Sequence, residues 1–259
     1  PAPVQVTAWG FAHGTGCPEI DYFLADPVAV AETEREHYAE KIVDLPCIVT
    51  YDPPVDYNLK GVSGLPYHQN GFITLACHAR YEKLSDEFLA TVAAIMRKLP
   101  EAYVEFGGHE FKRPYSIRRV SAAMKDIAPE RLIFSGSMTH LEHLQYYQRA
   151  DLLLDPFPHS GGVVGMEQLY MGVPVVTLYG TQPAGRSTSS VLTAMGRKEW
   201  IARTRDEYVD KAVALAADIP TLTKVRKTLR QELLDSPVVK DYAAAVEKAY
   251  RTMWLQWCA

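Results

Sequence analysis

This sequence has few cysteines and lacks a metal-binding motif. Four cysteines occur among 259 residues, no C-x-x-C pair is present, and the close pair His140 and His143 has no cysteine or acidic cluster at ligand spacing. Thiols this far apart in sequence indicate neither a disulfide framework nor a zinc site. We therefore expect reduced, mostly buried thiols at Cys17, Cys47, Cys77 and Cys258, and no metal ion.

Long apolar runs, a large net charge and internal repeats are also missing. No run approaches the roughly 20 residues that a membrane-spanning helix needs, and the first residues lack the charged and apolar regions of a signal peptide. The formal net charge of −4 gives no reason to expect nucleic acid or an anionic membrane as a partner. With 47% hydrophobic residues, the chain is predicted to be a cytoplasmic globular protein that recognises any anionic ligand locally.

A polar, glycine-containing stretch from Asp52 to Gln69 divides the chain into unequal parts. We expect a short first segment (1–69), a larger second domain (70–237) and a C-terminal helix (238–259) that packs back on the first segment. Within the first segment, Val4–Trp9 alternates like a strand and Glu32–Lys41 has helical composition. The last helix carries an apolar stripe at helical spacing, for which core packing is the expected role: Tyr242, Val246, Tyr250, Trp254 and Trp257.

Strands and helices alternate six times in the middle of the chain. The predicted strands are 72–77, 102–106, 131–135, 152–154, 173–178 and 200–202, and the helices between them are 85–99, 114–127, 139–149, 163–170 and 187–195. Helices at 205–219, 222–234 and 239–257 follow. The alternation predicts an α/β fold: a Rossmann-like parallel sheet with right-handed crossovers and helices on both faces, followed by C-terminal helices.

Ligands of such sheets bind outside the carboxyl ends of the strands, so the residues directly after each strand are candidates. They include cations, histidines and two glycine-containing loops: Arg80, Lys83, His109, His140, His143, Asp155–Gly165 and Gly180–Arg186. Each has an alternative structural role, such as a solvated charge at a helix start or a histidine packed on a neighbouring helix. Their convergence on one edge favours a phosphate-bearing ligand.

The loop before the helix Val163–Tyr170 is the strongest candidate. Free N–H groups and the positive end of the helix dipole favour an anion there, and Gly161, Gly162 and Gly165 would let a phosphate approach the backbone. Glu167, one turn into the helix, could accept hydrogen bonds from ligand hydroxyl groups. The alternative is a tight turn that merely lets the helix pack closely.

The sequence resembles the catalytic region of O-GlcNAc transferase and its bacterial cytoplasmic relatives, which are inverting glycosyltransferases of the two-domain GT-B architecture. The resemblance extends over nearly the whole chain and depends on the order and spacing of many short matches. These are Pro3–Gly10, Asp21–Tyr22, Tyr81–Lys83, Glu142–His143, Ala150–Asp151, Gly165–Glu167, Met171–Thr177, Arg186 and Ala249–Trp254. It implies that the chain is the C-terminal, nucleotide-sugar-binding half of such an enzyme.

The resemblance also implies roles for individual residues. Lys83 matches a catalytic lysine that contacts the diphosphate and supports its departure, and a fixed cation suits an enzyme without a metal. The remaining nucleotide-sugar positions are Arg80, Met138, His140, His143, Ser160, Gly161, Gly162, Val163, Val164, Glu167 and Arg186. Of these, His143 and the backbone near Met138 would adjoin the base, and Glu167 would accept from the ribose. Gly10, Ala12 and His13 belong to a loop that would face the sugar and the acceptor.

Three departures from the family pattern are apparent. Gly162, Val163 and Val164 stand where relatives commonly carry a histidine and two threonines, so the phosphates would depend on backbone N–H groups. His140 replaces a lysine near the base. The chain also begins at the end of the family's first domain, and we therefore expect the N-terminal half of the same protein to be a partner.

We therefore expect a metal-independent inverting glycosyltransferase, with no cofactor, that transfers GlcNAc or another hexose from a UDP-sugar to a Ser, Thr or Asn side chain of a protein. Two alternatives remain open at this point. One is a sugar-nucleotide epimerase of the same fold, with Asp155 and Glu110 as the obvious acid/base candidates. The other is a non-catalytic fragment that binds a nucleotide without turnover.

Overall fold

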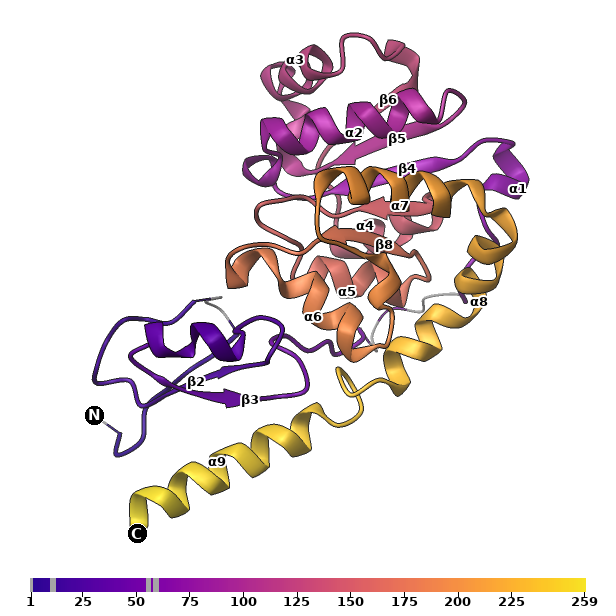
Figure 1. Cartoon of the computed structure of the whole chain (residues 1–259). Coiled ribbons are helices and arrows are strands. Elements are labelled where there is room, and N and C mark those ends of the chain that lie inside the picture. Colours follow the sequence, from indigo (N-terminus) through magenta and orange to yellow (C-terminus); the bar gives the residue numbers. More distant parts are fainter. Residues whose placement is uncertain (1, 10–12, 55–56, 58–60) are drawn as a thin grey trace.

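The computed structural model describes residues 2–9, 13–54, 57 and 61–259, which form two lobes with a long helix running beneath the smaller one (Figure 1). The smaller, N-terminal lobe holds a parallel three-stranded sheet of order β1-β2-β3, made of β1 (Val6–Thr7), β2 (Tyr22–Ala25) and β3 (Lys41–Asp44). The predicted helix at 32–41 is wrong. Only Glu32–His37 turns, as a 3₁₀ helix without a buried residue, and β3 follows it. The run of polar residues there has helical composition but no apolar face to hold a full helix.

The larger lobe is built on a parallel six-stranded sheet of order β6-β5-β4-β7-β8-β9. Its strands are β4 (Thr74–His78), β5 (Tyr103–Gly107), β6 (Leu132–Ser135), β7 (Leu152–Leu154), β8 (Val175–Leu178) and β9 (Ile201–Ala202). Numbered along the chain, this order is 3-2-1-4-5-6, that of the dinucleotide-binding Rossmann fold. The predicted α/β fold with a Rossmann-like sheet is confirmed. The order reverses between β4 and β7, which makes the ends of these two strands the expected ligand crevice.

Helices cover both faces of this sheet. They are α1 (Tyr67–Asn70), α2 (Asp86–Lys98), α3 (Pro114–Ala123), α4 (His140–Tyr146), α5 (Val163–Tyr170), α6 (Ser187–Ala194), α7 (Arg205–Ala217) and α8 (Ile219–Asp235). One apolar core joins α2, α3 and α7 to the sheet, and a second joins α4, α5, α6 and much of α8 to the opposite face (Figure 1). Alternate residues of β4 enter different cores, Leu75 the first and Ala76 the second, as a strand buried on both faces requires.

Two N-terminal caps fix where helices begin beside the crevice. The Ser85 hydroxyl accepts the N–H of Phe88 at the start of α2, and Thr139 forms a capping box with Glu142 at the start of α4. The capping box fixes the first turn of α4, which carries His140, and so helps to place His140 and His143 on the helix.

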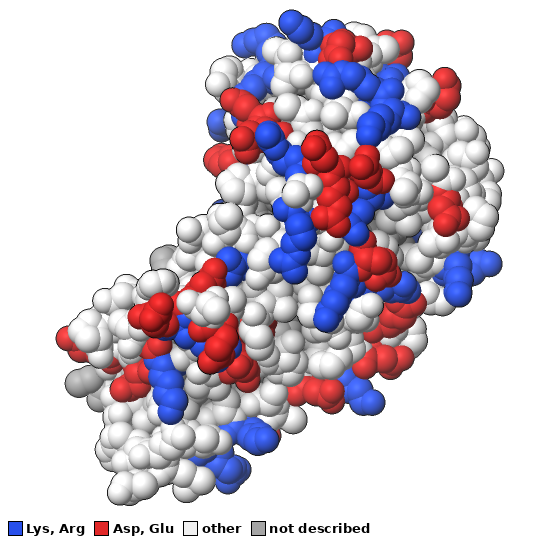
Figure 2. Space-filling model, in the orientation of Figure 1, with Lys and Arg blue, Asp and Glu red and all other residues white. Residues whose placement is uncertain are grey.

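The last helix, α9 (Tyr242–Cys258), packs on the N-terminal lobe. Its buried residues Tyr242, Ala249 and Met253 form an apolar cluster with Leu24 and Leu45. The predicted core packing of the apolar stripe is confirmed for Tyr242 and Val246. It is wrong for Tyr250, Trp254 and Trp257, which are 45%, 50% and 55% exposed. The helix is rotated so that a narrower face carrying alanines meets the strands, and the end of the molecule where α9 finishes is largely free of charge in Figure 2.

Polar contacts join the two lobes. Arg186 binds Glu34 with both ends of its guanidinium, at 2.5 and 2.7 Å, and the Ser190 hydroxyl donates to the buried carboxylate of Asp26 at 2.6 Å. No helix among the described residues is long and apolar enough to cross a membrane. All four cysteines are free. Cys47 and Cys77 are buried, and Cys258 is exposed.

Candidate functional site

The candidate site lies where the sheet order reverses. Lys83 stands in a 3₁₀ turn (Tyr81–Lys83) directly after β4, and the loop Asp155–Gly162 follows β7. The two meet through a hydrogen bond of 2.7 Å that the Lys83 Nζ donates to the carbonyl of Ser160, a residue 77 positions away. Lys83 and Ser160 are thus brought together at the crevice that the topology selects.

Buried Asp155 shapes the glycine loop. Its carboxylate accepts the N–H of Gly161 at 2.7 Å and the hydroxyl of Thr177 at 2.7 Å, and only 2% of the residue is exposed. Burial raises the pKa of Asp155, while the Thr177 and Gly161 hydrogen bonds oppose the rise. A Cβ at position 161 would stand 3.0 Å from the Asp155 Oδ1, so a larger residue would force the carboxylate or the loop to shift. The Asp155 carboxylate thus fixes the loop through these hydrogen bonds. Because it is buried, a sugar cannot reach it, and it is unsuited to be the acid or base of an epimerase.

The start of α5 presents unused backbone donors. Gly162 is the residue before the helix, and no side chain caps it. The N–H groups of Gly162, Val163 and Val164 donate to no residue that the structure describes. Val163 is 53% exposed, and a Cβ added at Gly162 would meet nothing within 4 Å, so this turn of the chain is open on its side-chain side. Three free N–H groups at the positive end of a helix dipole favour an anion.

Basic side chains lie close to the loop that leads into this helix. The pKa of Lys83 is lowered because the ammonium is partly buried, although Asp155 opposes the shift, and nearby Arg80 adds to it. Arg80 itself is exposed. The pKa of His159 is likewise lowered by burial, and Lys83, His13 and Arg80 contribute by charge repulsion. An anion placed here would relieve the mutual repulsion of these groups.

Glu167 lies one turn into α5, and the side chains of two histidines of α4 approach its carboxylate. His140 Nε2 is 2.6 Å from Glu167 Oε1, and His143 Nδ1 is 3.6 Å from Glu167 Oε2. Burial raises the pKa of the Glu167 carboxyl, and the hydrogen bond from His140 partly offsets this. A carboxylate can accept about four hydrogen bonds, so sites on both oxygens remain for hydroxyl groups of a ligand.

A tyrosine sets the tautomer of His143. The Tyr147 hydroxyl is 2.5 Å from His143 Nε2, and burial raises the pKa of Tyr147 well above its usual value, so the phenol keeps its proton and donates it. Gln168 Nε2 donates to the same oxygen from behind at 3.4 Å. His143 therefore carries its own proton on Nδ1, facing Glu167. Burial lowers the pKa of His143 to about 4, which keeps the ring neutral.

A third histidine, His78, lies beneath His143 at the end of β4. The two rings are 3.9 Å apart between centroids, and the Nδ1 of His78 is buried without a hydrogen-bond partner. Burial, with a smaller contribution from His143, lowers the pKa of His78 to about 3. His78 is thus a neutral ring that packs against His143, one of the two histidines that face Glu167.

Met138 and Val164 both pack against the apolar core that contains residues of α4 and α5. A 450 Å³ hollow also touches Met138, and Glu142 and Gln145 of α4 line it as well. Met138 is thus half-buried just before α4, and its place beside the base stays a prediction.

Arg186 is committed to the interface between the lobes. All five of its N–H groups donate within the protein: two to Glu34 and one each to the carbonyls of Gly180, Thr181 and Ala29. The residue is 4% exposed. A nucleotide contact for Arg186 stays a prediction, and it would require this guanidinium to exchange one of its present partners.

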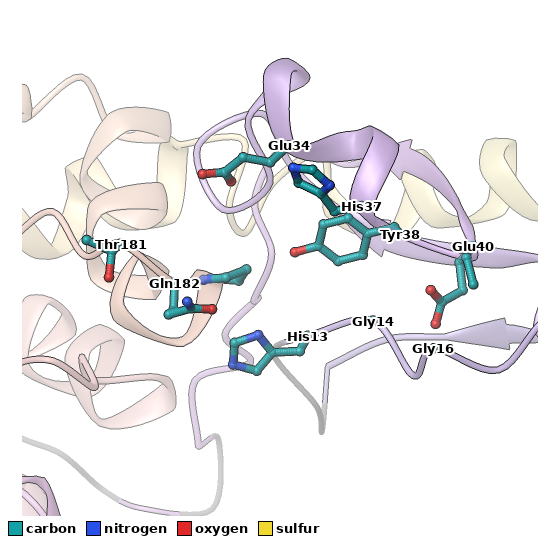
Figure 3. A pocket seen from close by; sticks show the side chains of 11 residues that line it. His13, Gly14, Gly16, Glu34, His37, Tyr38, Glu40, Thr181 and Gln182 are labelled. Atoms are coloured by element: carbon teal, nitrogen blue, oxygen red, sulfur yellow. The ribbon is translucent and has the colours of Figure 1, made fainter.

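A 380 Å³ pocket opens between the lobes, next to the cationic group (Figure 3). His13 lines it from one side and Gln182 from the other, and the Tyr38 hydroxyl points into it. The buried carboxylate of Glu40 accepts the Thr15 N–H and hydroxyl, which ties the loop after His13 to the lobe. The predicted acceptor-facing residues Gly10 and Ala12 lie outside the described residues.

Sequence reasoning missed several members of the site. His159 stands inside the loop that was singled out, one residue before Ser160, and its position there was the available signal. Tyr57 lies in the dividing stretch and contacts His140 with its hydroxyl 3.2 Å from Nδ1. No pattern in the sequence pairs Tyr57 with His140, because 83 positions separate them. Among the described residues, no group of three His, Cys, Asp or Glu side chains is placed to hold a metal ion.

Comparison with known proteins points to one family. Residues 69–246 match the profile of glycosyl transferase family 41. A barley (Hordeum vulgare) protein named probable UDP-N-acetylglucosamine–peptide N-acetylglucosaminyltransferase SPINDLY is 33% identical over 264 residues, and its Arabidopsis thaliana counterpart is 32% identical. The alignments include all of this chain but only 28% and 29% of those proteins. The chain thus spans less than a third of the curated relatives it matches.

A solved structure extends the comparison to three dimensions. A variant of Thermobaculum terrenum O-GlcNAc transferase superimposes with a TM-score of 0.90 at 34% sequence identity. The alignment covers 99% of this chain and 49% of that one. Both lobes therefore have counterparts in that protein, in the same relative arrangement.

Proposed function

Because the chain belongs to glycosyl transferase family 41, we propose that it binds a UDP-sugar at the carboxyl ends of β4 and β7 and serves in transfer of the sugar to a protein side chain. The names of its relatives describe peptide N-acetylglucosaminyltransferases. GlcNAc is accordingly the first sugar to test, and a peptide Ser or Thr the first acceptor. Because the chain spans under a third of those relatives, the complete reaction includes surfaces beyond these residues.

The observation that carries this proposal is the arrangement around the start of α5. The N–H groups of Gly162, Val163 and Val164 are free at the positive end of the α5 dipole. Lys83, which follows β4, reaches the loop in front of that helix through its bond to the Ser160 carbonyl. A diphosphate placed there would receive backbone hydrogen bonds and one fixed cation. Val163 and Val164 have no hydroxyl groups, so the hydrogen bonds from α5 to the diphosphate would come from the backbone.

Glu167 and its histidines would place the nucleoside. The ribose hydroxyls would donate to the two carboxylate oxygens, which His140 and His143 hold in position. The neutral ring of His143 and the backbone near Met138 would border the base. This assignment puts base, ribose and diphosphate in sequence along one edge, from α4 to the start of α5.

In the proposed reaction, the acceptor hydroxyl attacks the anomeric carbon from the face opposite the diphosphate. The bond from that carbon to the diphosphate oxygen breaks, the configuration inverts, and the electron pair leaves with UDP, while the proton of the acceptor hydroxyl passes to water. Charge grows on the β-phosphate as the bond lengthens, and the Lys83 ammonium with the α5 N–H groups would stabilise it. In this proposal these protein groups take the part that a metal ion has in other transferases.

The acceptor would approach from the pocket between the lobes. That pocket adjoins the cationic group through His13 and is lined by hydroxyl, amide and carboxylate groups of both lobes, which suit a polar peptide (Figure 3). The N-terminal half of the family's catalytic region would supply the rest of the acceptor surface.

Two measurements test the proposal. Calorimetric titration with UDP in EDTA should give one binding site per chain, and absence of binding would refute the assigned nucleotide site. Incubation with UDP-GlcNAc and a Ser/Thr-containing peptide, with the complete protein, should yield a glycosylated peptide by mass spectrometry. Conversion of UDP-GlcNAc to an epimer without any acceptor would instead favour the epimerase reaction.

A further inference from the structure

Tyr57 comes from the stretch that divides the lobes, yet its side chain lies on the nucleotide lobe. It packs against the apolar core that also receives Met138 and Val164. Its ring is 5.4 Å from that of His140 between centroids, and its hydroxyl is 3.2 Å from His140 Nδ1. The side chain therefore touches His140 on the edge opposite to the one that meets Glu167.

These contacts fix the direction of a chain of hydrogen bonds. Glu167 is an acceptor when ionised, so His140 donates to it from Nε2, and a neutral imidazole then has an acceptor at Nδ1. The Tyr57 hydroxyl fills that need as a donor. From the other side, Tyr147 donates to His143, which directs its own N–H to Glu167. Two tyrosines thus stand behind two histidines, and both histidines face one carboxylate.

The two tyrosine–histidine pairs differ in how firmly the protein holds them. Tyr147 is fully buried, and the side chain of His143 is 15% exposed. The side chain of His140, by contrast, is 45% exposed, so surrounding packing alone leaves its ring free to turn. The hydroxyl of Tyr57 is the second contact that fixes the ring.

We propose that Tyr57 is a positioning residue for the ribose of the bound nucleotide. By holding His140 so that Nε2 donates to Glu167, it keeps the remaining acceptor sites of that carboxylate directed at the ribose hydroxyls. This inference rests on the proposed nucleotide site. It adds that the segment between the lobes contributes a residue to recognition of the ribose.

Replacement of the hydroxyl alone gives the test. Tyr57→Phe keeps the ring and its packing and removes the donor to His140, so UDP should bind about threefold to tenfold more weakly, the range for loss of one hydrogen bond. The specific readout is the ratio of dissociation constants of deoxy-UDP and UDP, measured by calorimetry with the 2′-deoxy and 3′-deoxy nucleotides. The unchanged chain should disfavour at least one deoxy analogue clearly, and Tyr57→Phe should bring that ratio toward one.

Tyr22→Phe is the matched control. It also removes one phenol hydroxyl, which bonds Gln256 at 3.1 Å on the N-terminal lobe, and it should change neither UDP affinity nor the ratio. An equal loss for UDP and both deoxy analogues in Tyr57→Phe would mean that the residue acts only on general structure and would overturn the proposal. Tighter UDP binding would also overturn it, because Tyr57 would then obstruct the site.

A double-mutant cycle gives a second readout. In a His140→Ala background, Tyr57→Phe should have no further effect on UDP affinity, because its hydroxyl has lost the group through which it acts. Effects that multiply would place Tyr57 outside this chain of hydrogen bonds and refute the inference. Failure of the unchanged protein to bind UDP at all would refute the proposed function as well, and the unchanged protein is measured first for that reason.

Discussion

Exchange of Lys83 for methionine isolates the contribution of one positive charge. Methionine has an unbranched stem of similar reach, so the packing along the side chain is kept while the ammonium and its 2.7 Å bond to the Ser160 carbonyl are removed. The structure indicates that this ammonium is partly desolvated, because burial lowers its pKa. Part of the cost of taking it out of water is therefore met on folding, which strengthens its interaction with a bound diphosphate.

The size of the effect follows from that geometry. A charge-assisted hydrogen bond contributes about 1.5 to 3 kcal/mol, and the partial desolvation of Lys83 favours the upper half of that range. With 1.4 kcal/mol per factor of ten, Lys83→Met should weaken UDP binding by about 30-fold to 150-fold. Raising the salt concentration should narrow the difference, because the interaction is between charges near the surface.

Calorimetry with two ligands provides the assay and its control. UDP reports on the diphosphate, while uridine lacks the phosphates and should bind Lys83→Met as it binds the unchanged protein. Equal UDP affinity in both proteins would refute the role of Lys83. Parallel losses for uridine and UDP would show that the substitution disturbs the Ser160 loop, and the argument from charge would then fail.

Four further changes probe the loop, the lobe interface and the buried histidines. Gly161→Ala should lower the free energy of unfolding by about 1 to 3 kcal/mol and Gly162→Ala by less than about 0.5, since only the first Cβ meets a buried neighbour; equal midpoints in thermal unfolding would contradict this. Arg186→Ala should lower the free energy of unfolding by about 2 to 4 kcal/mol in urea titrations, near the value for a broken buried ion pair. Unchanged stability with weaker UDP binding would instead favour the nucleotide contact. His78 and His143, with pKa values of about 3 and 4 when folded against 6.5 unfolded, bind fewer protons in the folded state between those limits. Stability should therefore be complete above pH 6.5 and fall as the pH drops toward 4, by at most about 2 kcal/mol for each histidine at pH 5. Urea unfolding that is the same at pH 7 and pH 5 would refute this.

The sequence was most informative where periodicity and length were clear. The strand Leu152–Leu154 and the helix Val163–Tyr170 have the predicted bounds, and the six alternations yield the confirmed Rossmann-like sheet. Ligands of such sheets bind beyond the strand ends, and this rule predicts that Lys83 and the glycine loop lie at one edge of the sheet. The contact between them is not needed for that prediction. Local pattern and topology are enough for this much.

The N-terminal lobe and the last helix were beyond local pattern. Strands β2 and β3 have four residues each, too short for a reliable period, and their pairing is with one another across the polar segment between them. On α9 the largest aromatic side chains, among them Trp254 and Trp257, are the exposed ones. Which of two apolar faces is buried depends on the shape of the partner surface, and small residues such as Ala249 fit the strands more closely.

Within the candidate site, the side-chain network was also outside the reach of sequence. Glu167 and His140 are 27 positions apart, and Tyr57 is a further 83 positions from His140. Each is unremarkable by itself as a polar residue of a helix or a loop. Their joint action depends on which proton each ring carries, and that follows from the contacts alone.

A crystal structure of the protein with UDP bound would show whether the start of α5 holds the diphosphate. We expect the diphosphate within hydrogen-bonding distance of the N–H groups of Gly162, Val163 and Val164 and of the Lys83 Nζ, with a ribose hydroxyl on Glu167. A nucleotide seated elsewhere, or a diphosphate that leaves the start of α5 untouched, would contradict it.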